Sequence, residues 1–440
     1  MIVFLLVLIV VLALLGAVHW YVWRRLVRDV TRRGSLPRRL GTVAVVVLPV
    51  LSFAALGSAR AGAPFRLQQL VAWPGYLWLA LLLYLTLALV VGEAVRPVLR
   101  AWLARRDAAG AAASTPPVPA PAPAREPVPA ATQPADPTGP TGPTGPVEAD
   151  VPSGPAAEPG SVPTEVSRRL FVSRVVGGAA AAAAVGTVGY GTYGVLRGPR
   201  IKRVTVPLAK VPRAAHGYRI AVVSDIHLGP VLGRAHTQRI VDAINSTQPD
   251  LIAVVGDLVD GTVENLGPAA EPLARLRARH GSFFVTGNHE YFSGADAWVD
   301  HVRELGLRPL RNERVEIAAG FDLAGVDDIA GESEGQGPDF GRALGDRDRA
   351  RAAVLLAHQP VVVHDAVRHG VDLQLSGHTH GGQLWPGNYL AELANPTVAG
   401  LERYGDTQLY VSRGAGAWGP PVRVGAPSDI TLVQLASKQA

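Results

Sequence analysis

The chain contains no cysteine and a single methionine among its 440 residues. The absence of cysteine excludes disulfides, thiolate metal sites and a cysteine nucleophile, although it does not identify the cellular compartment. No Gly-Lys-Ser/Thr phosphate loop occurs either, so a nucleotide triphosphatase of the Walker type has no support. Catalysis, if present, must depend on other groups, and the carboxylates and histidines are the candidates.

The two halves of the chain carry opposite charge. Residues 1–200 hold 19 Lys and Arg against 9 Asp and Glu, a net charge of +10, whereas residues 201–440 hold 23 against 27, a net charge of −4. The high isoelectric point, about 9.8, therefore originates in the N-terminal half. Eleven of the twelve histidines lie after residue 200. Because that half has no basic excess, we expect no nucleic-acid partner.

Three apolar runs in the first hundred residues predict transmembrane helices: Ile2–Trp23, Gly41–Ala59 and Tyr76–Val95. Arginines gather between residues 24 and 40 and again after residue 95. The positive-inside rule places those two segments in the cytoplasm and the N-terminus outside. Residues 1–106 are therefore predicted to form a membrane region with three transmembrane helices, the alternative being buried helices of a soluble protein.

A linker and a fourth apolar run follow. Residues 107–166 are rich in Pro, Ala, Thr and Gly, which predicts a disordered linker. Ser167-Arg168-Arg169-Leu170-Phe171 then precedes the run Val175–Leu196 and resembles a twin-arginine export signal. An ordinary span with a basic flank is the alternative. No clear cleavage site follows, so residues 167–199 are predicted to be an uncleaved anchor, with residues 200–440 outside the cytoplasm.

Residues 200–440 alternate β-rich apolar runs with helical patterns, which predicts an α/β domain. Strands are expected over 218–224, 251–255, 282–286, 354–357 and 373–376, and helices over 236–247 and 273–279. Each of these five strands is followed by a residue type that binds metals, namely Asp225, Asp257, Asn288, His358 and His378. Functional groups of α/β sheets gather at the carboxyl ends of the strands, so these side chains should converge.

The candidate metal ligands are Asp225, His227, Asp257, Asn288, His358, His378 and His380. Carboxylate, imidazole and amide donors without thiolate suit two divalent ions such as Mn, Fe or Zn. Seven ligands are too many for one tetrahedral ion, but they suit two ions that share a carboxylate. Two metals about 3.5–4 Å apart can bind the attacking and leaving oxygens of a phosphoryl transfer and activate a bridging water.

The order of these motifs resembles the calcineurin-like metallophosphoesterases over residues 200–437. The matching blocks are Asp225-x-His227, Gly256-Asp257-x-x-Asp260, Gly287-Asn288-His289-Glu290, His358 and Gly377-His378-Thr379-His380. The resemblance implies a four-layer α/β/β/α sandwich in the 200–440 domain. The Gly-His-Thr-His-Gly-Gly-Gln form and the segment 412–416 look most like the bacterial membrane-associated phosphodiesterase branch.

The resemblance also implies roles. One metal should take Asp225, His227, Asp257 and His380, and the other should take Asp257, Asn288, His358 and His378. His289 should act beside the leaving oxygen as the catalytic residue without binding metal. Asp260 and Glu290 should orient ligands. We further hypothesise that Arg413 meets a substrate phosphate, although an ordinary surface arginine is an equal alternative.

Together these features predict a multi-pass cell-membrane enzyme that hydrolyses phosphoesters, with a phosphodiester favoured, by attack of a metal-bridging hydroxide. Tethering raises the effective concentration of phosphoesters in the same membrane, which favours a lipid- or envelope-linked substrate. The alternatives are a phosphomonoesterase or protein phosphatase, and a non-catalytic membrane scaffold that retains the fold. The sequence leaves the oligomeric state open.

Overall fold

The computed structural model describes residues 2–113 and 164–439. Most of the predicted linker therefore lies outside the described residues. The helices are α1 (Ile2–Trp23), α2 (Leu36–Gly57), α3 (Phe65–Ala113), α4 (Thr164–Leu196), α5 (Arg234–Ser246), α6 (Val263–Ala270), α7 (Asn288–Ser293), α8 (Ala295–Glu304), α9 (Phe340–Leu344), α10 (Val363–Arg368) and α11 (Gly387–Ala394). The strands are β1 (Arg200–Leu208), β2 (Arg219–Val223), β3 (Leu251–Val255), β4 (Ser282–Val285), β5 (Arg308–Pro309), β6 (Glu313–Ile317), β7 (Phe321–Gly325), β8 (Ala352–Leu356), β9 (Leu373–Ser376), β10 (Gly400–Tyr404), β11 (Thr407–Val411) and β12 (Asp429–Ser437).

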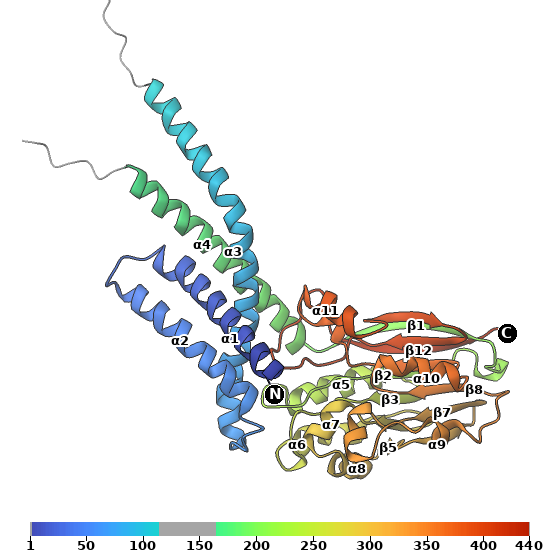
Figure 1. The fold of residues 1–440 in the computed structure, drawn as a ribbon. Helices are drawn as coiled ribbons and strands as arrows, with labels where there is room; N and C mark the ends of the chain where they lie inside the picture. The colour runs from blue at the N-terminus through green and yellow to red at the C-terminus, as the bar shows by residue number, and fades with distance from the viewer. Residues whose placement is uncertain (1, 114–163, 440) are drawn as a thin grey trace, which may run out of the picture.

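Helices α1 to α4 form a bundle beside the α/β domain (Figure 1). All four are long and apolar enough to cross a membrane. At the end of the bundle away from the domain, Arg25 of the turn after α1 donates a 2.8 Å hydrogen bond to Glu93 of α3. At the other end, Tyr76 of α3 donates to the Ala55 carbonyl of α2, and Gly191 of α4 lies against Val422 of the domain. The α2–α3 connection and the exit of α4 therefore share the end that carries the domain.

Two six-stranded mixed sheets make up the domain, with strand orders β1-β12-β2-β3-β4-β5 and β10-β11-β9-β8-β7-β6. Strands β2, β3, β4 and β5 run parallel in the first sheet, and β7, β8, β9 and β11 run parallel in the second. The strands that precede the candidate ligands thus lie next to one another in both sheets.

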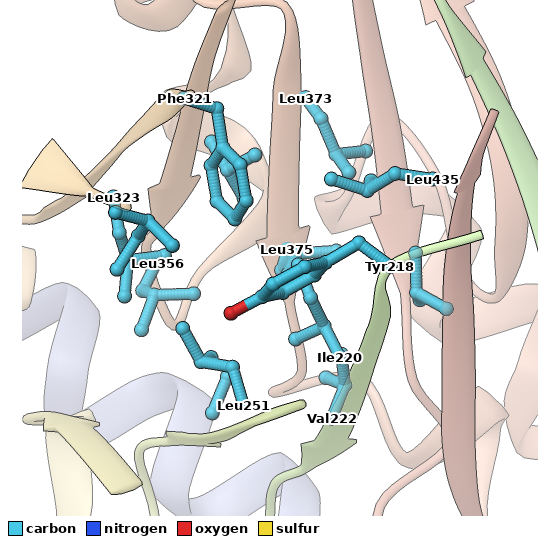
Figure 2. Close-up of a cluster of buried hydrophobic side chains, with 14 of the residues drawn as sticks. Tyr218, Ile220, Val222, Leu251, Phe321, Leu323, Leu356, Leu373, Leu375 and Leu435 are labelled. Carbon is cyan, nitrogen blue, oxygen red and sulfur yellow. The ribbon is translucent and has the colours of Figure 1, made fainter. Parts of the chain in front are cut away.

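The sheets face each other across an apolar core (Figure 2). Alternating residues of each strand enter this core, such as Ile220 and Val222 of β2 facing Phe321 and Leu323 of β7. The intervening residues, such as Ala221 and Val223, pack instead beneath α5, α6 and α8. On the second sheet α9 and α10 cover the outer face. This period-two alternation produces four layers, so the predicted α/β/β/α sandwich is confirmed.

All five strands predicted to precede ligands are present, with ends shifted by at most two residues. The helix predicted over 273–279 is wrong. A 3₁₀ turn from Glu271 to Arg275 stands there, and the backbone of Leu276 is extended. Asn245 of α5 binds the backbone there instead, donating to the Arg275 carbonyl at 2.8 Å and accepting the Arg277 N–H at 2.9 Å, which satisfies these groups without a helix.

Candidate metal centre

Five of the seven predicted ligands follow strands β2, β3 and β9 on strained backbone. Asp225, His227, Asp257, His378 and His380 all adopt positive φ, between 49° and 73°, a region that residues with a Cβ seldom occupy. Such strain persists only where the surroundings enforce it, and it concentrates at functional sites. Each sharp turn aims a polar side chain inward at the point where its strand ends.

Two glycines make room for these side chains. A Cβ on Gly377, directly after β9, would clash with Oδ2 of Asp225. A Cβ on Gly287, directly before α7, would clash with Oδ1 of Asp257. Gly377 therefore lets loops of the two sheets approach each other closely, and Gly287 does the same for the neighbouring loops after β3 and β4 of the first sheet.

Asp225, His227 and His380 form one cluster of potential ligands. The Nε2 atoms of the two histidines lie 3.0 Å apart, and His380 Nε2 lies 3.4 Å from Oδ1 of Asp225. The Asp225 carboxylate also accepts the backbone N–H of His378 at 3.0 Å, which ties the loop after β2 to the loop after β9. All three side chains are buried.

Asp257, His358 and His378 form a second cluster. Nε2 of His358 lies 3.2 Å from Oδ2 of Asp257, and Oδ1 of Asn288 lies 3.0 Å from Nδ1 of His378. Asp257 also approaches the first cluster, because its Oδ2 atom is 3.7 Å from Nε2 of His227. This one carboxylate therefore lies between the two clusters.

His289 lies at the mouth of the centre. Its Nδ1 atom is 2.7 Å from Oδ1 of Asp260, and its Nε2 atom is 4.0 Å from Oδ2 of Asp257. The same Asp260 oxygen accepts a 2.9 Å hydrogen bond from Nδ1 of His227. Asp260 thus fixes two imidazole rings at once and leaves the Nε2 atom of His227 free for the centre.

Glu290 is fully buried and binds backbone rather than side chains. One carboxylate oxygen accepts the N–H groups of Asp257 at 2.9 Å and Gly287 at 2.6 Å, and the other accepts that of Leu258 at 2.8 Å. These three bonds clamp the turn after β3 to the turn after β4, so Glu290 positions both Asp257 and Asn288.

Sequence reasoning missed Arg423, which is buried behind His380. Its guanidinium donates to Nδ1 of His380 at 2.9 Å, to the His380 carbonyl at 3.0 Å and to the Gly416 carbonyl at 2.7 Å. These bonds fix the ring of His380 from the side away from His227. No motif surrounds Arg423, and only the folded chain brings it here.

Burial and pairing determine the charges of the centre. Burial opposes protonation of His227, yet the Asp260 carboxylate raises its pKa to about 9. His358 behaves likewise, since Asp257 raises its pKa well above the ordinary value despite burial. Burial lowers the pKa of His378 to about 4, and burial together with the neighbouring His227 lowers the pKa of His380 well below its ordinary value. The carboxylates thus favour positive charge at the middle of the centre.

The donor atoms fit divalent cations. Nε2 of His358 is buried and, among the residues that the structure describes, makes no well-aligned hydrogen bond, although it lies 3.2 Å from the Asp257 carboxylate. An unpaired buried polar atom is costly unless a ligand satisfies it. The Nε2 atoms of His227 and His380 likewise point at each other and at carboxylates. Imidazole, carboxylate and amide donors packed this closely are typical of sites for transition-metal ions.

Comparison with known proteins agrees with this chemistry. Residues 218–382 match the family model of the calcineurin-like phosphoesterases. An uncharacterized metallophosphoesterase of Aquifex aeolicus is 36% identical over 243 residues, which cover 54% of this chain and 92% of that protein. The chain belongs to the calcineurin-like metallophosphoesterase family.

Other relatives are named as transmembrane proteins. The transmembrane protein with metallophosphoesterase domain of Danio rerio is 39% identical over 264 residues, 57% of this chain and 60% of that protein. The chain therefore spans about 60% of the length of that relative. Among solved structures, a dimetal phosphatase from Danio rerio is 12% identical, covers 49% of this chain and 91% of that one, and superposes with a TM-score of 0.34.

The metallophosphoesterase centre opens into two hollows, and Arg413 lines neither. One cleft, of about 240 Å³, is lined by His227, Asp260 and His289. A second, of about 720 Å³, reaches His378 and His380. Arg413 borders a separate cavity of about 300 Å³ beyond Gly381, so its suggested contact with substrate stays a prediction.

Proposed function

We propose that the chain is a membrane-anchored dimetal phosphoester hydrolase that favours phosphodiesters. The observation that carries this proposal is the convergence of seven carboxylate, imidazole and amide groups in two adjoining clusters. One metal would be held by Asp225, His227, Asp257 and His380, and the other by Asp257, Asn288, His358 and His378. Asp257 lies between the clusters and would serve both ions. Mn, Fe and Zn all suit these donors.

When bound, two such ions lower the pKa of a shared water towards neutrality. His289 is the general acid of this proposal. Oδ1 of Asp260 lies 2.7 Å from its Nδ1 atom, so Nε2 is the ring nitrogen that faces the centre. As the water oxygen bonds to phosphorus and the ester P–O bond breaks, Nε2 would give its proton to the departing alkoxide oxygen.

Phosphodiesterase and phosphomonoesterase activity can be separated directly. The full-length protein, purified in detergent with MnCl₂, is assayed with bis(4-nitrophenyl) phosphate and with 4-nitrophenyl phosphate. We expect the diester to be the better substrate, Asp257→Asn to abolish its hydrolysis, His289→Ala to lower it, and metal analysis to find close to two ions per wild-type chain. Two bound ions with no hydrolysis of either ester would instead support a non-catalytic scaffold.

We also propose that the catalytic domain lies outside the cytoplasm, with Arg168 and Arg169 in a signal anchor. The support is the arginine distribution together with the arrangement of the bundle, in which the α2–α3 connection and the domain share one end. An alkaline phosphatase fusion after residue 440 should be active in whole cells. An inactive fusion, combined with an active cytoplasmic reporter at the same position, would show that the domain lies in the cytoplasm.

A further inference from the structure

An apolar groove connects the metal centre with the membrane-spanning helix α3. Its volume is about 720 Å³, in the range of pockets that hold small organic ligands, roughly 300–1,000 Å³. The inner end touches His378 and His380. The walls are made by Leu83, Leu384, Pro386, Tyr389, Leu390 and Trp418. A groove so apolar, with imidazoles at its end, suits a molecule with a hydrocarbon part and a polar reacting group.

Helix α11 forms the outer wall and presents apolar side chains outward. Trp385, Tyr389, Leu390 and Leu393 are 51%, 60%, 72% and 84% exposed, and α11 contains no buried residue. Exposing this surface to water would be unfavourable by roughly 25 cal/mol per Å². Figure 1 shows α11 at the side of the domain that faces the bundle. The outward face of α11 is therefore suited to lipid.

The contact between α3 and the segment before α11 indicates how deep α11 lies in the membrane. Tyr84 donates a 3.0 Å hydrogen bond to the carbonyl oxygen of Trp385, two residues before α11. Tyr84 lies eight residues after Tyr76, where the predicted span begins, which is about 12 Å along the helix. The segment at Trp385 thus meets α3 inside its membrane-spanning stretch, and the groove opens at that level.

A cation lines the other hollow that reaches the centre. Arg60, in the connection between α2 and α3, lines the smaller cleft together with His227 and His289. Arg60 is exposed and forms no ion pair with any residue within 2–113 and 164–439. An unpaired guanidinium that faces a phosphoryl-transfer centre suits the phosphate of a substrate.

We propose that the groove between α3 and α11 holds a hydrocarbon chain of a membrane lipid, while the lipid's phosphoester reaches the metal centre and Arg60 contacts its phosphate. This inference rests on the proposed function and deepens it, because it assigns the substrate to the membrane-lipid class. The chain would enter sideways from the bilayer, so the lipid would not have to leave the membrane.

The test uses two chromogenic diesters that differ only in chain length, 4-nitrophenyl methyl phosphate and 4-nitrophenyl dodecyl phosphate, with the full-length protein in nanodiscs and MnCl₂. We expect a KM at least ten-fold lower for the dodecyl ester. Leu390→Asp should remove that difference by raising the KM of the dodecyl ester to that of the methyl ester. Leu393→Asp, on the same helix but outside the groove, should keep it.

The outcomes separate the possible explanations. Equal KM values for the two esters in the wild type would overturn the groove assignment. If Leu390→Asp and Leu393→Asp lose the preference for the dodecyl ester equally, α11 serves only to hold the domain at the membrane. If Leu390→Asp converts a dimer to a monomer, this face of α11 is a contact between two copies of the chain. Either result would overturn the groove assignment. Failure to hydrolyse both esters would count against the proposed function instead.

Arg60 has a matched control in Arg66, which is exposed on the first turn of α3 and does not line the cleft. Arg60→Ala should raise KM for both esters about ten-fold, the loss expected for one charge-assisted hydrogen bond to phosphate. Arg66→Ala should leave KM unchanged. Equal effects of the two substitutions would show that only the net charge of this end of the bundle matters, and Arg60 would then have no specific role.

Discussion

Replacing Glu290 by Gln should destabilise the fold by a measurable and bounded amount. The amide oxygen can keep the two hydrogen bonds from Asp257 and Gly287, but the NH₂ group then faces the N–H of Leu258, which donates to the other carboxylate oxygen at 2.8 Å. One buried donor left without an acceptor costs about 1–3 kcal/mol. For a domain of this size, that corresponds to a fall in Tm of about 2–12 °C.

The assay is thermal unfolding of the full-length protein followed by near-ultraviolet circular dichroism, with excess chelator and with excess MnCl₂. Both conditions are needed because a bound metal itself stabilises the folded state. Glu264→Gln serves as the control, since Glu264 is an exposed carboxylate in the first turn of α6. If Glu290→Gln melts within 1 °C of the wild type in chelator, Glu290 does not clamp the two turns as described.

Two further changes test other parts of the centre, and a third tests a buried histidine of α5. Asp260→Asn should lower kcat about 10–100-fold with the aryl diester, the usual effect of removing a group that orients a ligand, and an unchanged kcat would contradict that role. Arg423→Met should release the ring of His380 and lower metal affinity about ten-fold, measurable by metal titration; unaltered affinity would refute it. Burial lowers the pKa of His236 to about 3, and neither ring nitrogen has a hydrogen-bond partner within residues 2–113 and 164–439, so the folded state resists protonation. The stability of the folded state should therefore fall as pH drops from about 6.5 towards 3. His236→Leu should reduce the difference in Tm between thermal melts at pH 7.5 and pH 5.0. The same difference in both proteins would exclude His236 as its cause.

Much of the fold could be predicted because its signals are local. The strands over 251–255 and 373–376 are short apolar runs that end at polar residues, and they fold as expected. The candidate ligands follow directly from those ends. Pairing over long distances carries no such signal: β12 lies parallel to β1 and antiparallel to β2, although more than 200 residues separate it from both.

Two features of the site depend on tertiary contacts alone. Arg423 reaches His380 only after the loop before β12 folds over the centre. A prediction based on hydrophobicity would place the apolar residues of α11 in a buried core. In the structure they are exposed, next to α3. We propose that lipid, and not water, surrounds that face of α11. A single sequence does not show whether a helix face meets lipid or water.

The junction between α4 and β1 has a kinetic consequence. Three residues, 197–199, separate Leu196 from Arg200, a reach of roughly 10 Å when extended. With α4 in the membrane, this short junction keeps the domain close to the bilayer surface. Encounters with a lipid substrate would occur by diffusion in two dimensions, so turnover should follow the mole fraction of that lipid in the surface. Adding inert lipid at a constant bulk substrate concentration should slow the enzyme by surface dilution.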